Sequence, residues 1–286
     1  EALLQRKHGS FPVAKALADI AQYYGFDGWF FNQETEGATQ SMASAMVDFL
    51  TEVHGHGTGV LWYDAMTESG SVGWQGALDS QNDAFFAVSD GMFVDFRWSP
   101  ASLTSSAAYA TGMGRQPNEL FAGIDVGSEQ YGGQSQMDEI FPPKAASGVS
   151  VALYRPDFTL SGDPSQFQER EDRFWVGEDG DPSSSKPDES GWRGMSAEIA
   201  EHTTVTSTPF VTSFGTGHGH GWWHQGTQWQ ANDWNNLSAQ DVLPTWRWVV
   251  DGSKLTLGYD MTNAWQGSQS VAIAGTVSKA TTIWLY

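Results

Sequence analysis

Two polar side chains, Asn32 and Glu34, follow the aromatic run at residues 28–31. Successive side chains of a strand point to opposite faces, so a strand here would place both residues on one face, about 7 Å apart. A carboxylic acid in this place can act as a general acid, and an amide beside it can donate or accept a hydrogen bond. The same two residues could also cap a strand and begin a loop. Spacing alone leaves both interpretations open.

The amide at position 32 restricts the chemistry that a glycosidase could use here. Most retaining glycosidases use a second carboxylate as the nucleophile, and an amide cannot serve in that role. The alternative is assistance by the substrate, whose 2-acetamido oxygen attacks the anomeric carbon and forms an oxazolinium intermediate. Asn32 could hold that acetamido group and stabilise the charge that develops on it.

Helices and strands are predicted to alternate through the first part of the chain. The apolar spacing predicts helices at residues 13–24, 41–53, 82–88 and 102–113, and strands at 28–31, 59–63, 92–98, 120–126 and 149–154. This alternation is typical of βα units around a parallel sheet. The five units favour a (β/α)8 TIM barrel whose first strands are missing from this chain, with Asn32 and Glu34 at the edge where barrel enzymes place catalysis. An open doubly wound sheet is the alternative, which the absence of a glycine-rich phosphate loop disfavours.

The later part of the chain differs in composition and in the spacing of its apolar residues. Residues 161–195 are rich in Pro, Gly, Ser and acidic side chains, which predicts a long loop near a domain boundary. Short Thr, Val and Trp runs between Gly and Asn turns then predict strands at residues 203–214, 245–250, 254–259, 270–273 and 281–286. This pattern is typical of a β-sandwich. We therefore predict a carboxyl-terminal part of a barrel at residues 1–195 and a truncated β-sandwich domain at residues 196–286.

Composition excludes several classes of function. The 34 acidic and 14 basic residues give a net charge of −20, which would repel nucleic acid. No apolar run is long enough for a transmembrane helix, so no membrane insertion is predicted, and the lack of cysteine excludes thiol chemistry. No signal peptide is visible, and both cytoplasmic and secreted locations stay open. The 14 tryptophans favour a carbohydrate protein, because indole rings pack on the apolar faces of sugars.

Several segments resemble one enzyme family. The motif Phe26-Asp27-Gly28 followed by Asn32 and Glu34 is similar to the signature of the endo-β-N-acetylglucosaminidases of glycoside hydrolase family 85. Matching segments occur in order at residues 11–14, 61–64, 123–126, 173–177, 209–219 and 234–246. The resemblance implies a barrel followed by β-sandwich domains. It also implies retaining cleavage between the two GlcNAc residues of the N-glycan chitobiose core, with transglycosylation as a further outcome.

The resemblance also assigns residue roles. It implies that Glu34 is the acid/base, that Asn32 orients the acetamido group, and that Tyr63 contacts the reacting acetamide. The residues expected to bind the substrate are Gln33, Trp74, Trp98 and Tyr154. The expected partners are N-linked glycans and glycoproteins, with no obligate protein partner.

No cofactor is predicted. Two histidine pairs, His54 with His56 and His218 with His220, could suggest metal ligands together with His224, but glycine-flanked histidines in loops are typical of ordinary polar loops. Tryptophans 222, 223, 229, 234, 246 and 248 could form a sugar-binding face or pack in the core of a β-sandwich.

Two other functions are weighed against the hydrolase of family 85. A family 18-like chitinase shares the Phe-Asp-Gly and Glu outline, but that family has an aspartate two residues before the glutamate, where this chain has Asn32. A non-catalytic carbohydrate-binding protein would need neither Glu34 and Asn32 nor Tyr63 as a set.

Overall fold

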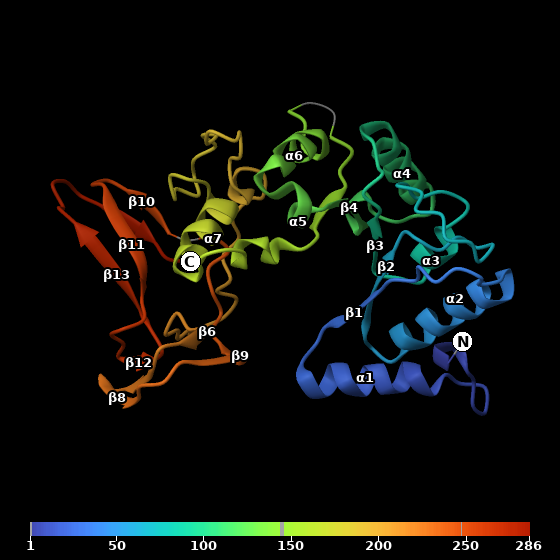
Figure 1. Cartoon of the computed structure of the whole chain (residues 1–286), viewed down its shortest axis with the longest axis horizontal. Coiled ribbons are helices and arrows are strands. Elements are labelled where there is room, and N and C mark those ends of the chain that lie inside the picture. The colour runs from blue at the N-terminus through green and yellow to red at the C-terminus, as the bar shows by residue number, and fades with distance from the viewer. Residues whose placement is uncertain (1, 144–145, 247) are drawn as a thin grey trace. The chain divides into compact units, whose positions relative to one another are not determined.

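The computed structural model describes residues 2–143, 146–246 and 248–286, and the chain divides into two compact units, Glu1–Phe158 and Thr159–Tyr286 (Figure 1). The division falls before the predicted boundary at residues 195 and 196. The reason is that α7 (Phe167–Val176) packs with segments that follow it. The Phe174 ring stacks on Trp192 at 5.2 Å between centroids, and Trp175 lies 6.4 Å from Trp246.

The first unit is built on a parallel sheet. Its five strands lie in the order β1 (Gly28–Phe31), β2 (Gly59–Tyr63), β3 (Gly91–Val94), β4 (Leu120–Ile124) and β5 (Ser150–Leu153). The connections carry α2 (Gln40–Gly55), α3 (Asp83–Ala87), α4 (Pro100–Gly112), α5 (Val126–Glu129) and α6 (Gln134–Ile140), and α1 (Pro12–Tyr24) precedes β1. Consecutive strands are neighbours without a reversal of order, which confirms the predicted βα units. The closed barrel stays a prediction.

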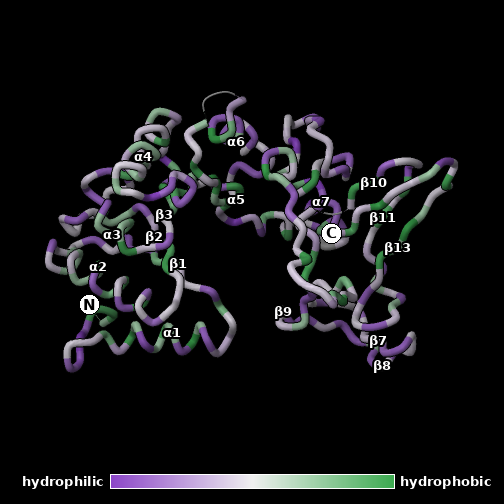
Figure 2. Tube along the Cα trace, turned by 180° about the vertical axis from the view of Figure 1, so that it is seen from behind, coloured by the Kyte–Doolittle hydropathy of each residue, from purple (hydrophilic) through white to green (hydrophobic). Residues whose placement is uncertain are grey.

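The two faces of this sheet differ in what covers them. On the helix side, the fully buried Trp62 ring stacks on Phe85 of α3, with 4.5 Å between centroids and 11° between planes. The opposite face carries aromatic rings from neighbouring strands, among them Tyr63 and Phe93, 5.4 Å apart. Figure 2 shows hydrophobic colour along β1, β2 and β3, and alternating colours along the amphipathic α1. The sheet therefore has a helix-covered side and an aromatic side.

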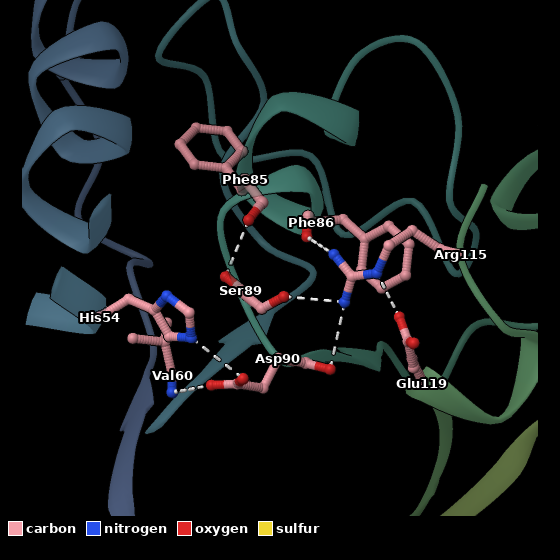
Figure 3. A network of polar contacts seen from close by, with 8 residues as sticks. All are labelled: His54, Val60, Phe85, Phe86, Ser89, Asp90, Arg115 and Glu119. Carbon is pink, nitrogen blue, oxygen red and sulfur yellow. Dashed lines mark hydrogen bonds and ion pairs between the residues drawn. The ribbon is translucent and has the colours of Figure 1, made fainter. Parts of the chain in front are cut away.

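A polar network fixes the amino ends of β2, β3 and β4 (Figure 3). The Asp90 carboxylate accepts the main-chain N–H of Val60 at 2.7 Å and lies 3.2 Å from Nε2 of His54. The Arg115 guanidinium pairs with Glu119 and donates to the carbonyl oxygens of Phe86, Ser89 and Asp90. This network lies at the edge opposite to the strand ends that carry Glu34.

The second unit contains small antiparallel sheets of two or three strands. The pairs and the triplet are β6 (Thr216–Gly219) with β9 (Trp234–Gln240), β10 (Val249–Asp251) with β14 (Thr282–Trp284), β11 (Leu255–Asp260) with β13 (Ser270–Gly275), and β8 (Thr227–Gln230) and β12 (Gln266–Gly267) on either side of β7 (Trp222–His224). Of the tryptophans weighed above, 223, 246 and 248 are buried and 229 is exposed. The β-sandwich stays a prediction.

One predicted strand of the second unit is wrong, and five strands, β6 to β9 and β12, were not predicted. Residues 203–214 form neither helix nor strand, because Pro209 lacks an N–H and other donors bond elsewhere. The main-chain N–H groups of Ser213 and Gly215 both donate to the Asp241 carboxylate. β6 to β9 were not predicted because apolar and polar residues do not alternate clearly along them. Arg247, inside the predicted strand at residues 245–250, lies outside the described residues. Among the described residues, no helix is long and apolar enough to cross a membrane.

Candidate active site

The Glu34 carboxylate accepts one hydrogen bond on each of its oxygens. The amide nitrogen of Asn32 donates to Oε2 at 3.0 Å, and the indole nitrogen of Trp74 donates to Oε1 at 2.7 Å. Asn32 and Glu34 follow β1 two residues apart, and Trp74 comes from the long loop between β2 and α3. Two donors from different segments therefore fix the orientation of one exposed carboxylate.

The loop that carries Trp74 is held by a buried aspartate. Asp64, directly after β2, accepts the side-chain N–H of Asn82 at 2.8 Å and the main-chain N–H of Ala77 at 3.2 Å. Burial raises the pKa of Asp64 to about 6, although both hydrogen bonds act to lower it. Trp74 itself has a φ of 37°, which is uncommon for a residue other than glycine. The fold of this loop therefore sets where the indole N–H points.

Tyr63 and Asp95 form a second polar pair. The Tyr63 hydroxyl donates to Oδ2 of Asp95 at 2.9 Å, and the two residues are only 6% and 4% exposed. Burial, the charge of Asp95 and its hydrogen bond, and the charge of Glu34 all raise the pKa of Tyr63 well above its usual value of 10.0. Tyr63 therefore stays protonated at neutral pH, with its proton directed to Asp95.

A row of aromatic rings continues from these polar groups across the sheet. Neighbouring ring centroids lie 5.9 Å apart for Phe30 and Tyr63, 5.5 Å for Phe93 and Phe96, and 5.5 Å for Phe96 and Tyr154. Phe30 is 49% exposed, so part of this surface is open to solvent. Flat apolar rings beside a hydrogen-bonding carboxylate are well suited to hold a sugar ring, which has apolar C–H faces and polar edges.

The other predicted site residues, Gln33, Trp98 and Tyr154, contact groups other than Glu34. Gln33 donates its amide to the carbonyl of Thr35 at 3.0 Å. Trp98 is 8% exposed and donates its indole N–H to the carbonyl of Gly123 at 2.7 Å. Tyr154 is exposed and follows β5, beyond Phe96. The structure thus brings together Asn32, Glu34 and Trp74, places Tyr63 close by, and joins Gln33 and Trp98 to other partners.

Three residues of this region were not predicted to act in the site, namely Asp64, Asp95 and Arg97. Asp95 and Arg97 fell inside a strand predicted to run to residue 98, whereas β3 ends at Val94. The Asp95 carboxylate accepts the main-chain N–H of Arg97 at 3.1 Å, and this turn ends the strand. A sequence signal does exist, because acidic residues follow three successive strands at positions 64, 95 and 125.

The contacts of Asp125 hold the local structure together. It accepts from the N–H of Ser128 and so caps α5, and it accepts three hydrogen bonds from the guanidinium of Arg155. Although burial acts to raise the pKa of Asp125, the hydrogen bonds from Arg155 and Ser128 lower it below its usual value. Within residues 2–143, 146–246 and 248–286, no group of three or more His, Cys, Asp or Glu could hold a metal ion.

Comparison with known proteins gives evidence on the family of this chain that does not depend on the geometry of the site. The model of glycosyl hydrolase family 85 matches residues 1–222. The chain is 29% identical to the cytosolic endo-β-N-acetylglucosaminidase of Gallus gallus over 273 residues, and 28% identical to that of Homo sapiens over 277 residues. Each match covers 93% of this chain and 34% of the relative, so the chain spans about a third of the length of these proteins.

Among solved structures, the glycoside hydrolase domain of Endo-D from Streptococcus pneumoniae R6 is similar, with a TM-score of 0.86 and 33% sequence identity. The similarity covers 98% of this chain and 47% of that chain. The family model extends over well more than half of the 286 residues and includes every residue of the site described above. The chain therefore belongs to glycosyl hydrolase family 85.

Proposed function

We propose that this chain carries the acid/base of an endo-β-N-acetylglucosaminidase. The enzyme hydrolyses the β-1,4 bond between the two GlcNAc residues of the N-glycan chitobiose core, with retention. The observation that carries this proposal is the Glu34 carboxylate held by both Asn32 and Trp74 at the carboxyl edge of the sheet. The similarity to the endo-β-N-acetylglucosaminidases of chicken and human supports the same reaction.

In the first step, Glu34 gives its proton to the bridging oxygen as the glycosidic bond breaks. The 2-acetamido oxygen of the sugar attacks the anomeric carbon, and an oxazolinium ring forms. Asn32 donates its amide N–H to Glu34, which leaves its amide oxygen to accept the N–H of the acetamido group. Accepting that N–H directs the acetamido oxygen to the anomeric carbon and stabilises the developing positive charge.

In the second step, Glu34 acts as a base. It removes a proton from water, the oxygen adds to the anomeric carbon, and the oxazolinium ring opens to restore the acetamide. Two displacements at one carbon give retention. A sugar hydroxyl in place of water gives transglycosylation by the same route.

The fold proposal is that β1–β5 belong to a (β/α)8 barrel and that residues 196–286 belong to a β-sandwich domain. The consecutive order of the five parallel strands supports the barrel, because each unit adds its strand beside the previous one. The similarity to the hydrolase domain of Endo-D supports it further. N-linked glycans and glycoproteins are the partners that we propose.

The experiment compares wild type with E34Q in the full-length protein, using an N-glycoprotein as substrate. We expect E34Q to lose the release of glycan by about a hundredfold or more, because the leaving oxygen loses its proton donor. Binding of the glycan should persist. A non-catalytic sugar-binding protein would release no glycan in either form, and an E34Q variant that kept the wild-type rate would remove Glu34 from the mechanism.

A further inference from the structure

Arg97 lies between the two polar pairs of the site. Its main-chain N–H donates to Oδ1 of Asp95 at 3.1 Å, while the other oxygen of Asp95 accepts the Tyr63 hydroxyl. Its guanidinium carbon lies 4.7 Å from the centroid of the Trp74 ring, and Trp74 donates to Glu34. Arg97 therefore contacts both Asp95, which binds the tyrosine, and Trp74, which binds the acid/base.

The contact with Trp74 is supported by the main chain around it. Gly76 has a φ of 60°, and a Cβ added there would lie 2.6 Å from the carbonyl carbon of Arg97. The loop after Trp74 thus packs directly on the backbone that begins at Arg97. The guanidinium completes this arrangement, because a cation over an indole face is attracted by the ring and also restricts its rotation.

The contact with Asp95 adds an electrostatic link. Asp95 is buried, and Nε of Arg97 is 3.9 Å from its Oδ1. A buried carboxylate is costly unless it is hydrogen-bonded and its charge is balanced. The tyrosine hydroxyl, the main-chain N–H and the guanidinium together meet this need. The side chain of Arg97 is itself 60% exposed, so its stacking on Trp74 and its link to Asp95 are what orders it.

We infer that Arg97 is a positioning residue, which holds the Trp74 indole against Glu34 while it supports the Asp95 partner of Tyr63. The inference rests on the proposed function, in which Glu34 is the proton donor. Among the described residues, the contacts of Arg97 in this site are with Trp74 and Asp95, and Trp74 in turn bonds Glu34, so Arg97 acts through Trp74. Small displacements of a catalytic group can lower a rate by up to about a hundredfold, which sets the scale of the expected effect.

The test uses R97M, which keeps an unbranched side chain of similar length and removes the planar cation. In the full-length protein, we expect R97M to lower kcat on a natural glycopeptide about tenfold, with KM within about twofold of wild type. The loss should shrink with a glycan nitrophenyl glycoside, because a weakly basic leaving group needs less proton donation. An effect of equal size on both substrates, or an unchanged kcat on the glycopeptide, would overturn the inference.

A double-mutant cycle separates positioning from general damage. If Arg97 acts on Glu34 through Trp74, R97M should cost less activity in a W74F background than in the wild-type background, whereas fully additive losses would contradict that route. R6M is the matched control, because Arg6 also lies over an aromatic ring, Phe11, and pairs with an aspartate, Asp48. It should keep wild-type kcat, and an equal loss in R6M would overturn the inference.

Two further measurements keep the result interpretable. If R97M lowers the melting temperature, R97K takes its place in the same cycle, because it keeps the charge near Asp95 and loses the planar stack. E34Q is measured in parallel. Activity retained in E34Q would refute the proposed function, whereas loss in E34Q with unchanged kcat in both Arg97 variants would refute only the role of Arg97.

Discussion

The indole nitrogen of Trp74 donates to Oε1 of Glu34 at 2.7 Å, although 40 residues of chain separate them. An aromatic residue expected to line a sugar path is therefore also a hydrogen-bond partner of the acid/base. The second oxygen of Glu34 is held by Asn32, so the carboxylate cannot rotate without losing a donor. Orientation of this group depends on the loop between β2 and α3.

Replacing Trp74 tests this relationship. W74F keeps an aromatic ring and removes the indole N–H, so we expect kcat to fall between about tenfold and a hundredfold with little change in melting temperature. W29F is the matched control, because the indole N–H of Trp29 donates to the carbonyl of Leu17 at 3.1 Å and not to Glu34. It should lower stability by about 1 kcal/mol and keep kcat. A rise in KM alone for W74F would show that Trp74 only binds sugar.

Local patterns predicted much of the first unit. The strands expected at residues 28–31 and 59–63 agree residue for residue with β1 and β2, because glycine begins each one and polar residues end it. Asn32 and Glu34 lie just beyond the end of β1, where their side chains meet at 3.0 Å. The strand expected at residues 92–98 ends early because Asp95 bonds its own turn, and that bond depends on φ and ψ angles that composition does not specify.

Contacts between residues far apart in the chain could not be predicted from the sequence. Asp95 meets Tyr63 only because β2 and β3 are neighbours in register, and Trp74 meets Glu34 only because Asp64 holds the intervening loop. In the second unit, irregular register between β6 and β9, and between β7 and β8, removes the strict alternation that strand prediction needs. Glycine-rich strands such as Thr216–Gly219 give little hydrophobic signal.

Tyr63 provides a prediction about pH. Burial and Asp95 raise the pKa of Tyr63, so its hydroxyl stays protonated through the neutral and moderately alkaline range. We expect Y63F to lower kcat by about tenfold or more, because the hydroxyl predicted to contact the acetamido group is removed and the buried Asp95 carboxylate loses a hydrogen bond. The ratio of wild-type kcat to Y63F kcat should stay constant from pH 5 to 9 (about four decades of proton concentration). Kinetics at several pH values check this, and an effect that vanished at alkaline pH would mean that Tyr63 ionises.

Asp64 provides a prediction about stability. Its pKa is raised by burial from 3.8 to about 6, so the fold favours the protonated form. The contribution of protonated Asp64 to the free energy of unfolding is fully present below about pH 4. It is lost as the pH rises through about 6, and the total loss is roughly 3 kcal/mol. D64N should remove this decline in the free energy of unfolding between pH 4 and 6. Urea denaturation across that range measures it, and an identical decline in D64N would assign it to another group.

The most direct test of the account concerns Asn32. If the acetamido oxygen is the nucleophile, Asn32 acts while the oxazolinium forms, and N32A should nearly abolish hydrolysis of an intact glycopeptide. Glu34 would remain to deprotonate an acceptor. A preformed glycan oxazoline bypasses the lost step, so N32A should still transfer it to a GlcNAc-peptide.

N32D is a useful companion, because it places a carboxylate where the amide stood and tests whether charge alone can hold the acetamido group. The decisive measurement gives N32A both substrates, the glycopeptide and the oxazoline with its acceptor, and compares each rate with wild type. Substrate assistance through Asn32 predicts selective loss of hydrolysis with transfer retained. Loss of both reactions, or equal retention of both, would contradict substrate assistance through Asn32.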